Sequence, residues 1–168
     1  MNRDSEGLSA KAGTTFEYSQ KLIGEFSVGY LARHYRDPAL QSFGGFLLDG
    51  ALIWTSSALT AFKLAATTTA AESTIPGVSG VLTRGLAAQV NHAFRRWLTA
   101  TGTFAFWLDD YEGSPRVDKR YATSALLTYK ATREFWFKAE YRHEWRTSNF
   151  PGNDYTADVL LLGVRLQR

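Results

Sequence analysis

The chain has 168 residues, a formal net charge of +3 and no cysteine. This length allows one domain, residues 1–168, with a sizeable core. The missing cysteine excludes a disulfide framework and any thiolate metal site, and the mild, scattered charge does not favour nucleic-acid binding. No apolar run approaches the roughly 18 residues of a membrane-spanning helix. Membrane strands would escape that test, because their alternating residues average out in a hydropathy window.

Apolar and polar residues alternate along most of the chain, which predicts β-strands throughout. The Ala/Thr run at 63–71 is the one place where a helix is an alternative, and its β-branched threonines favour a strand. Each predicted strand has about 9–13 residues, which exceeds the usual soluble length of about 5–6 and reaches the 9–11 tilted residues that cross a bilayer. In chain order they are a weaker strand at 8–18, then 25–35, 46–55, 61–69, 83–94, 97–109, 121–130, 135–145 and 156–168.

The stretch FWFKAEYRHEW at 135–145 shows the alternation most clearly. Every second residue from Phe135 is apolar or aromatic except His143, whereas the intervening residues from Lys138 onward are charged. A transmembrane barrel favours this pattern, because the apolar set faces lipid and the charged set faces a water-filled interior. The residues predicted to line that interior are Glu25, Arg33, Asp49, Lys63, Lys130, Lys138, Glu140, Arg142, Glu144, Arg146 and Arg165.

Short and long connections alternate between the predicted strands. The short ones fall near 19–21, 56–60, 95–96 and 131–134, and the long ones at 36–44, 71–80, 109–119 and 147–154. All four prolines, Pro38, Pro76, Pro115 and Pro151, lie in the long connections, as expected for residues that cannot donate to a strand ladder. Short turns at one rim and longer loops at the other are typical of outer-membrane barrels.

Aromatic residues gather at both ends of the strands, which predicts the two interfacial girdles of a membrane barrel. The predicted girdle residues are Tyr18, Trp54, Phe62, Phe94, Trp97 and Phe135 by the short turns, and Tyr111, Tyr121, Trp145 and Tyr155 by the long loops. Together these patterns predict an all-β, antiparallel, up-and-down transmembrane β-barrel with eight or nine long strands. The alternative is a soluble lipocalin-like barrel or sandwich.

Several longer stretches resemble the putative β-barrel porin 2 family of bacterial outer membranes, and the resemblance covers nearly the whole chain. It implies an outer-membrane barrel, a loose association with polysaccharide export, and no catalytic residues to carry over. The stretches are GEFSVGYLARHYRDP (24–38), NHAFRRWL (91–98), TATGTFAFWLDDYEG (99–113) and the region from DKRYATSALLTYK (118–130) to the closing LGVRLQR (162–168).

Two features depart from a complete outer-membrane barrel. The start of the chain, MNRDSEGLSAKAG, has no apolar signal-peptide core, and nine strands is an odd number where bacterial single-chain barrels have an even one. We therefore expect the chain to be the C-terminal portion of a larger barrel. The alternative is an eight-stranded barrel from Leu22 onward, with residues 1–20 as a peripheral segment.

The last strand resembles the signal that the barrel-insertion machinery reads. Gly163, Val164 and Leu166 fit its pattern, whereas the terminal Arg168 stands where such signals usually have an aromatic residue.

Catalytic and metal chemistry are not expected. His34, His92 and His143 fall in separate predicted strands, so no metal site is predicted. Asp109, Asp110 and His143 could supply Asp–His chemistry at a barrel rim, but their spacing matches no motif.

The sequence thus predicts a non-enzymatic, cofactor-free, porin-like barrel of the Gram-negative outer membrane. The expected partners are outer-membrane lipid, the insertion machinery, and either small polar solutes or exported polysaccharide, with no nucleic acid. The alternative is a small closed barrel that acts structurally or binds through its outer loops, because the interior charges could pair and fill it.

Overall fold

The computed structural model describes residues 4–36 and 42–166. Pro38 and the terminal Arg168 lie outside these ranges. The described residues form nine strands, and among them there is no helix long and apolar enough to cross a membrane. The strands are β1 (Ser5–Ser19), β2 (Leu22–Tyr35), β3 (Phe43–Ser57), β4 (Thr60–Glu72), β5 (Gly80–Arg95), β6 (Leu98–Glu112), β7 (Val117–Lys130), β8 (Phe135–Ser148) and β9 (Tyr155–Leu166).

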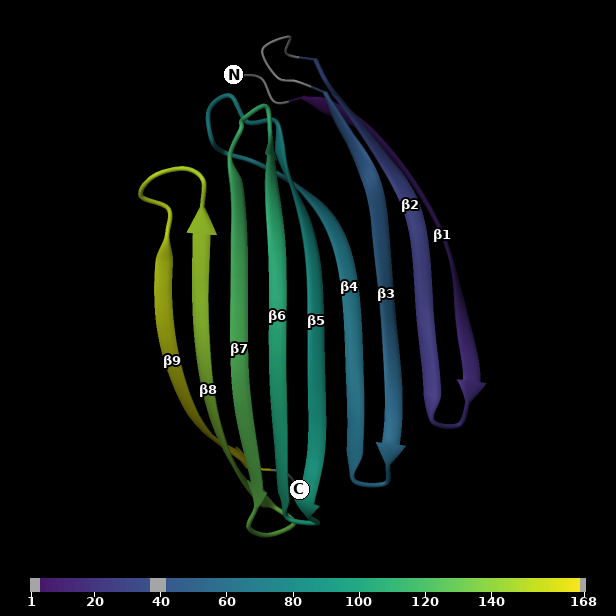
Figure 1. The fold of residues 1–168 in the computed structure, drawn as a ribbon, viewed down its shortest axis with the longest axis vertical. Helices are drawn as coiled ribbons and strands as arrows, with labels where there is room; N and C mark the ends of the chain where they lie inside the picture. The colour runs from purple at the N-terminus through teal and green to yellow at the C-terminus, as the bar shows by residue number, and fades with distance from the viewer. Residues whose placement is uncertain (1–3, 37–41, 167–168) are drawn as a thin grey trace.

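All nine strands belong to one antiparallel sheet in which each strand pairs with the next along the chain (Figure 1). The predicted all-β, up-and-down architecture is therefore confirmed. In the described residues β1 pairs only with β2, and β9 only with β8, so the sheet is not closed into a ring. Strand β1 pairs with β2 along its length, from Ser5↔Tyr35 to Ser19↔Leu22, so it is an integral strand and not a peripheral segment.

The connections separate into two kinds, as the sequence indicates. Tight turns at 20–21, 58–59, 96–97 and 131–134 lie at one end of the sheet, which we call the short-turn end. The other four connections lie at the opposite end, which we call the long-loop end and which is at the top of Figure 1. Of these, the connection between β6 and β7 is no longer than the turn at 131–134.

The predicted loop at 109–119 is wrong. Strand β6 continues to Glu112 and β7 begins at Val117, so only residues 113–116 turn. Gly113 makes this turn possible with a φ of +88°, in a region that side-chain-bearing residues rarely adopt. The acidic residues that suggested a loop are instead paired across the two strands, Asp109 opposite Asp118.

Among the described strands, β3 and β4 separate over part of their length, whereas the other register shifts are confined to the short-turn ends of β1–β2, β3–β4 and β5–β6. The pairing of β3 with β4 extends from Ser57↔Thr60 at the short-turn end to Gly50↔Ala66, and the two strands separate beyond that point. There the Asp49 carboxylate accepts a hydrogen bond from the Thr68 backbone N–H at 3.3 Å, which partly replaces the lost ladder.

A small apolar cluster bridges the separated strands at the long-loop end. The Tyr35 hydroxyl donates to the Ser79 carbonyl, and the Phe43 ring lies so close to Gly80 that a Cβ there would be 2.7 Å from the ring. The hydrophobic residues buried within the described part of the chain are few: Tyr35, Phe43, Val78, Leu82 and Ala105. The sheet thus has no central core of the kind that a soluble domain of this size buries.

Candidate functional site: the charged face of the sheet

The strand registers place all the predicted interior residues on one face, which we call the charged face. Pairing can be followed across the sheet: Lys63 lies opposite Gln89, and Lys130 opposite Trp136, which lies opposite Arg165. The same tracing places the remaining members on this face: Glu25, Arg33, Asp49, Lys138, Glu140, Arg142, Glu144 and Arg146.

The opposite face, which we call the apolar face, exposes large hydrophobic side chains on every strand. A soluble protein rarely exposes a continuous apolar surface of this extent, which marks a membrane or a partner interface. Members from β1 to β5 are Leu8, Phe16, Phe26, Val28, Tyr30, Phe46, Leu48, Trp54, Phe62, Leu64, Leu86, Val90 and Phe94. Members from β6 to β9 are Phe104, Leu127, Tyr129, Phe135, Phe137, Tyr141, Leu160, Leu162, Val164 and Leu166.

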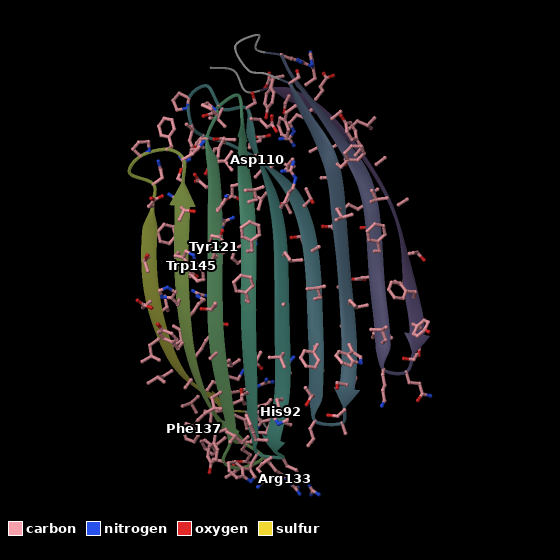
Figure 2. The ribbon with its side chains drawn as sticks, in the orientation of Figure 1. His92, Asp110, Tyr121, Arg133, Phe137 and Trp145 are labelled. Atoms are coloured by element: carbon pink, nitrogen blue, oxygen red, sulfur yellow. The ribbon has the colours of Figure 1, made fainter. Side chains whose placement is uncertain are left out.

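Aromatic rings lie toward both ends of the apolar face, and others, such as that of Tyr141 on β8, lie between them. Tyr121 and Trp145 stack with centroids 5.0 Å apart toward the long-loop end, whereas Phe137 lies toward the short-turn end (Figure 2). The eight steps from Phe137 to Trp145 correspond to roughly 26 Å along the strand, or about 20 Å along the membrane normal at a tilt of about 40°. That spacing is close to the height of the apolar band of an outer-membrane barrel, about 25 Å.

Two of the predicted girdle residues do not lie on the apolar face. Tyr111 follows Asp109 by two positions and Tyr155 pairs with Arg146, so the register places both on the charged face. Each ring there contacts an arginine, Arg116 at 4.4 Å from the Tyr111 centroid and Arg146 at 5.1 Å from that of Tyr155. Position near a strand end alone does not reveal the face. The signal that does is alternation with a charged residue of the same strand, Asp109 for Tyr111 and Arg165 for Tyr155.

The long-loop end of the charged face buries two carboxylates. Asp118 is fully buried and accepts hydrogen bonds from Arg116 at 2.6 and 3.0 Å and from the Tyr111 hydroxyl at 3.1 Å. Asp118 raises the pKa of the Arg116 guanidinium through this hydrogen bonding. This network was not predicted from the sequence, because residues 109–119 were expected to form a loop.

The second carboxylate, Asp109, is also buried. It accepts two hydrogen bonds from Arg120, at 2.5 and 3.0 Å, and one from the Thr83 hydroxyl at 2.6 Å. A buried carboxylate is stable only when it is paired and hydrogen-bonded in this way.

Opposite charges also meet elsewhere on the charged face. Arg142 pairs with Glu144 at 2.9 Å on β8, and Lys11 of β1 pairs with Asp49 of β3. At the short-turn end Lys130 lies over the Trp136 ring, 4.4 Å from its centroid. Charged side chains thus occur toward both ends of this face, and their densest contacts lie at the long-loop end.

A few polar groups interrupt the apolar face, and the sequence did not predict their pairing. Arg84 forms an ion pair with Asp110 near the long-loop end. Asp158 accepts hydrogen bonds from the Tyr141 hydroxyl and from His143, both at 2.7 Å. Each of these groups has a partner, which lowers the cost of placing it on an apolar surface.

The structure does not assemble a catalytic or metal-binding constellation. Asp109 lies on the charged face, whereas Asp110 and His143 lie on the apolar face with partners of their own. Of the other histidines, His34 bonds Ser42, and His92 bonds Thr60 at the short-turn end (Figure 2). Among the described residues no group of three or more His, Asp or Glu side chains could hold a metal ion.

Comparison with known proteins gives one match. The family model described as putative beta-barrel porin 2 matches residues 1–168, the whole chain. No curated protein and no solved structure matches significantly.

Proposed function

Since the chain belongs to the putative beta-barrel porin 2 family, we propose that it forms part of a barrel in the Gram-negative outer membrane. Its apolar face contacts lipid, and its charged face surrounds an aqueous passage for small polar solutes. The observation that carries this proposal is the separation of the two faces, because every predicted interior charge shares one face of the sheet.

Energetics favour this orientation over the reverse. A lysine or arginine facing lipid at the middle of the membrane costs about 2–4 kcal/mol, and the charged face has a lysine or arginine at several levels of β8, Lys138, Arg142 and Arg146 among them. The apolar face, in contrast, exposes large hydrophobic side chains, which gain from contact with lipid.

A wide barrel agrees better with the sheet than a small closed one. Strands β1 and β9 run in the same direction, since eight antiparallel steps separate them. A ring with antiparallel neighbours throughout therefore requires an odd number of further strands beside these nine. Barrels of about eight strands have room only for side chains, whereas larger ones leave a channel.

The remaining partners follow from the same orientation. Outer-membrane lipid would surround the apolar face, and the barrel-insertion machinery would read the end of β9, where Gly163, Val164 and Leu166 lie. Polysaccharide, instead of small solutes, would pass along the same charged face. This alternative is supported by the loose association of the family with polysaccharide export.

The first test uses the complete barrel, in which these nine strands are joined by the further strands that close the ring. It is refolded in detergent and run on a gel with and without boiling, and its conductance is then measured in a planar bilayer. We expect a heat-dependent mobility shift and discrete conductance steps. A monodisperse species in plain buffer without a shift would refute the membrane orientation. A detergent-stable barrel without conductance would support the closed, loop-binding alternative and refute the passage.

A further inference from the structure

We infer that the long-loop end of the charged face binds a carboxylate-bearing saccharide. The site is one row of four side chains across β6 to β9: Trp107, Arg120, Arg146 and Tyr155. This inference names a solute class for the proposed function and rests on it, because the charged face must be open to water.

The four side chains are direct neighbours in the sheet. Trp107 lies opposite Arg120, Arg120 opposite Arg146, and Arg146 opposite Tyr155. The Arg120 guanidinium lies 5.3 Å from the Trp107 ring centroid, and that of Arg146 lies 5.1 Å from the Tyr155 centroid. Two arginines at the centre are thus flanked and oriented by two aromatic rings.

The charge in this region is not balanced. Arg120 pairs with Asp109, and Arg116 pairs with Asp118. The third arginine, Arg146, has its Nη1 atom 3.9 Å from the Asp118 carboxylate, which is beyond hydrogen-bonding distance.

Arg146 donates through Nε to the Asn153 carbonyl at 2.7 Å, and no carboxylate of the described residues lies within hydrogen-bonding distance of its guanidinium. The next charged-face residue on β8 toward the short-turn end, Glu144, is bound by Arg142 at 2.9 Å. Three arginines against two buried carboxylates leave one positive charge, centred on Arg146.

The row on the short-turn side of this site consists mainly of small side chains. It contains Ala87, Ala105, Ala122, Glu144 and Ala157. Alanine side chains rise little above the sheet. Ala105 is buried by its neighbours, whereas Ala157, at the β9 end of the row, is only half-buried, so a ring-shaped solute can lie beside Arg146 against that end of the row. Strands that carried bulky residues at these positions would fill that space.

This arrangement favours a particular ligand chemistry. Arginine binds carboxylates through two parallel N–H bonds, and an aromatic ring offers an apolar face to the C–H groups of a sugar. A neutral sugar would gain only the ring contact, and an inorganic anion only the charge contact. A saccharide that carries a carboxylate gains both.

The test is calorimetric titration of the complete barrel, refolded in detergent, with trigalacturonate, maltotriose and inorganic sulfate. We expect trigalacturonate to bind at least about tenfold more tightly than either other probe. Arg146→Gln should weaken its binding about tenfold, the usual effect of losing a charge-assisted hydrogen bond. Arg146→Lys should recover only part of the loss, because an ammonium does not reproduce the guanidinium fork.

Two further variants separate the ring contact from the charge contact. Tyr155→Ala should weaken trigalacturonate binding several-fold and leave sulfate binding unchanged, and Tyr155→Phe should behave as the unaltered protein. Arg84→Gln is the matched control, since Arg84 lies toward the same end of the sheet on the apolar face. It should not change the binding of any probe.

Equal affinity for sulfate and trigalacturonate would overturn the saccharide site in favour of a simple anion site. An Arg146→Gln protein that binds trigalacturonate normally would overturn the location. A barrel that conducts but binds none of the probes would overturn this inference and leave the proposed function standing. A protein that neither shifts on the gel nor conducts would instead refute the proposed function.

Discussion

The two halves of the long-loop end are stabilised in opposite ways. Over β6 to β8 the ladder is continuous, and the end is closed by buried carboxylates, Asp109 and Asp118, held by arginines. Over β2 to β5 the ladder between β3 and β4 stops at Gly50↔Ala66, and the end is closed by the rings of Tyr35 and Phe43. An uninterrupted ladder thus accompanies the polar network, and an apolar cluster accompanies the separated strands.

The largest expected effect comes from removing the most buried charge. Asp118→Ala should lower the free energy of unfolding by about 3–5 kcal/mol, because Arg116 is then left partly buried without its carboxylate. Urea unfolding in lipid vesicles, followed by tryptophan fluorescence, measures this. Asp110→Ala is the control: its partner Arg84 is half exposed, so it should cost less than about 1 kcal/mol. Equal losses in the two variants would contradict the buried network.

A smaller and more local effect is expected from the apolar cluster. Phe43→Ala should cost about 3 kcal/mol through lost burial and a cavity beside Gly80. Hydrogen exchange should then accelerate at the long-loop ends of β2 and β3 and stay unchanged in β6 to β8. Faster hydrogen exchange in β7 would show that the two halves of the long-loop end form one cooperative unit, and would contradict their separate stabilisation.

The turn between β6 and β7 gives a third, intermediate effect. Gly113→Ala should cost about 1–2 kcal/mol, because alanine is strained at a φ of +88°. The new Cβ would also meet the Gly77 carbonyl at 2.7 Å, which links this turn to the loop before β5. The matched control is Gly163→Ala, whose Cβ meets no atom within 4 Å and which should unfold at nearly the same urea concentration as the unaltered protein.

The smallest effect is expected from an exposed ion pair. Glu72 pairs with Arg33 at 2.9 Å across the separated strands, and its side chain is more than half exposed. Glu72→Gln should therefore cost less than about 1 kcal/mol, and the loss should shrink further in high salt. A larger loss of unfolding free energy, independent of salt, would show that this ion pair, and not the cluster of Tyr35 and Phe43, holds β2 and β3 against β4 and β5.

The sequence predicted the strands and their two faces because alternation is a local signal that every strand repeats. Lys63 and Arg165, distant in the chain, were assigned to one face from alternation alone, and the register agrees. The prediction was weakest at the long-loop end, where Asp109 and Asp118 suggested a loop. Only the cross-strand register brings Arg116 and Arg120 to these carboxylates, so composition alone could not reveal strands there. The contact of Phe43 with Gly80, beside the interruption between β3 and β4, is likewise one that no local pattern encodes.

The central claim is that the charged face meets water and the apolar face meets lipid. The chain has no cysteine, so single cysteines at positions 139 to 144 of β8 can each carry one spin label in lipid vesicles. We predict alternating accessibility: labels at Ala139, Tyr141 and His143 collide mainly with oxygen dissolved in the bilayer, and labels at Glu140, Arg142 and Glu144 with a water-soluble nickel chelate. Uniform accessibility to the nickel chelate at all six positions, or the opposite alternation, would contradict the account.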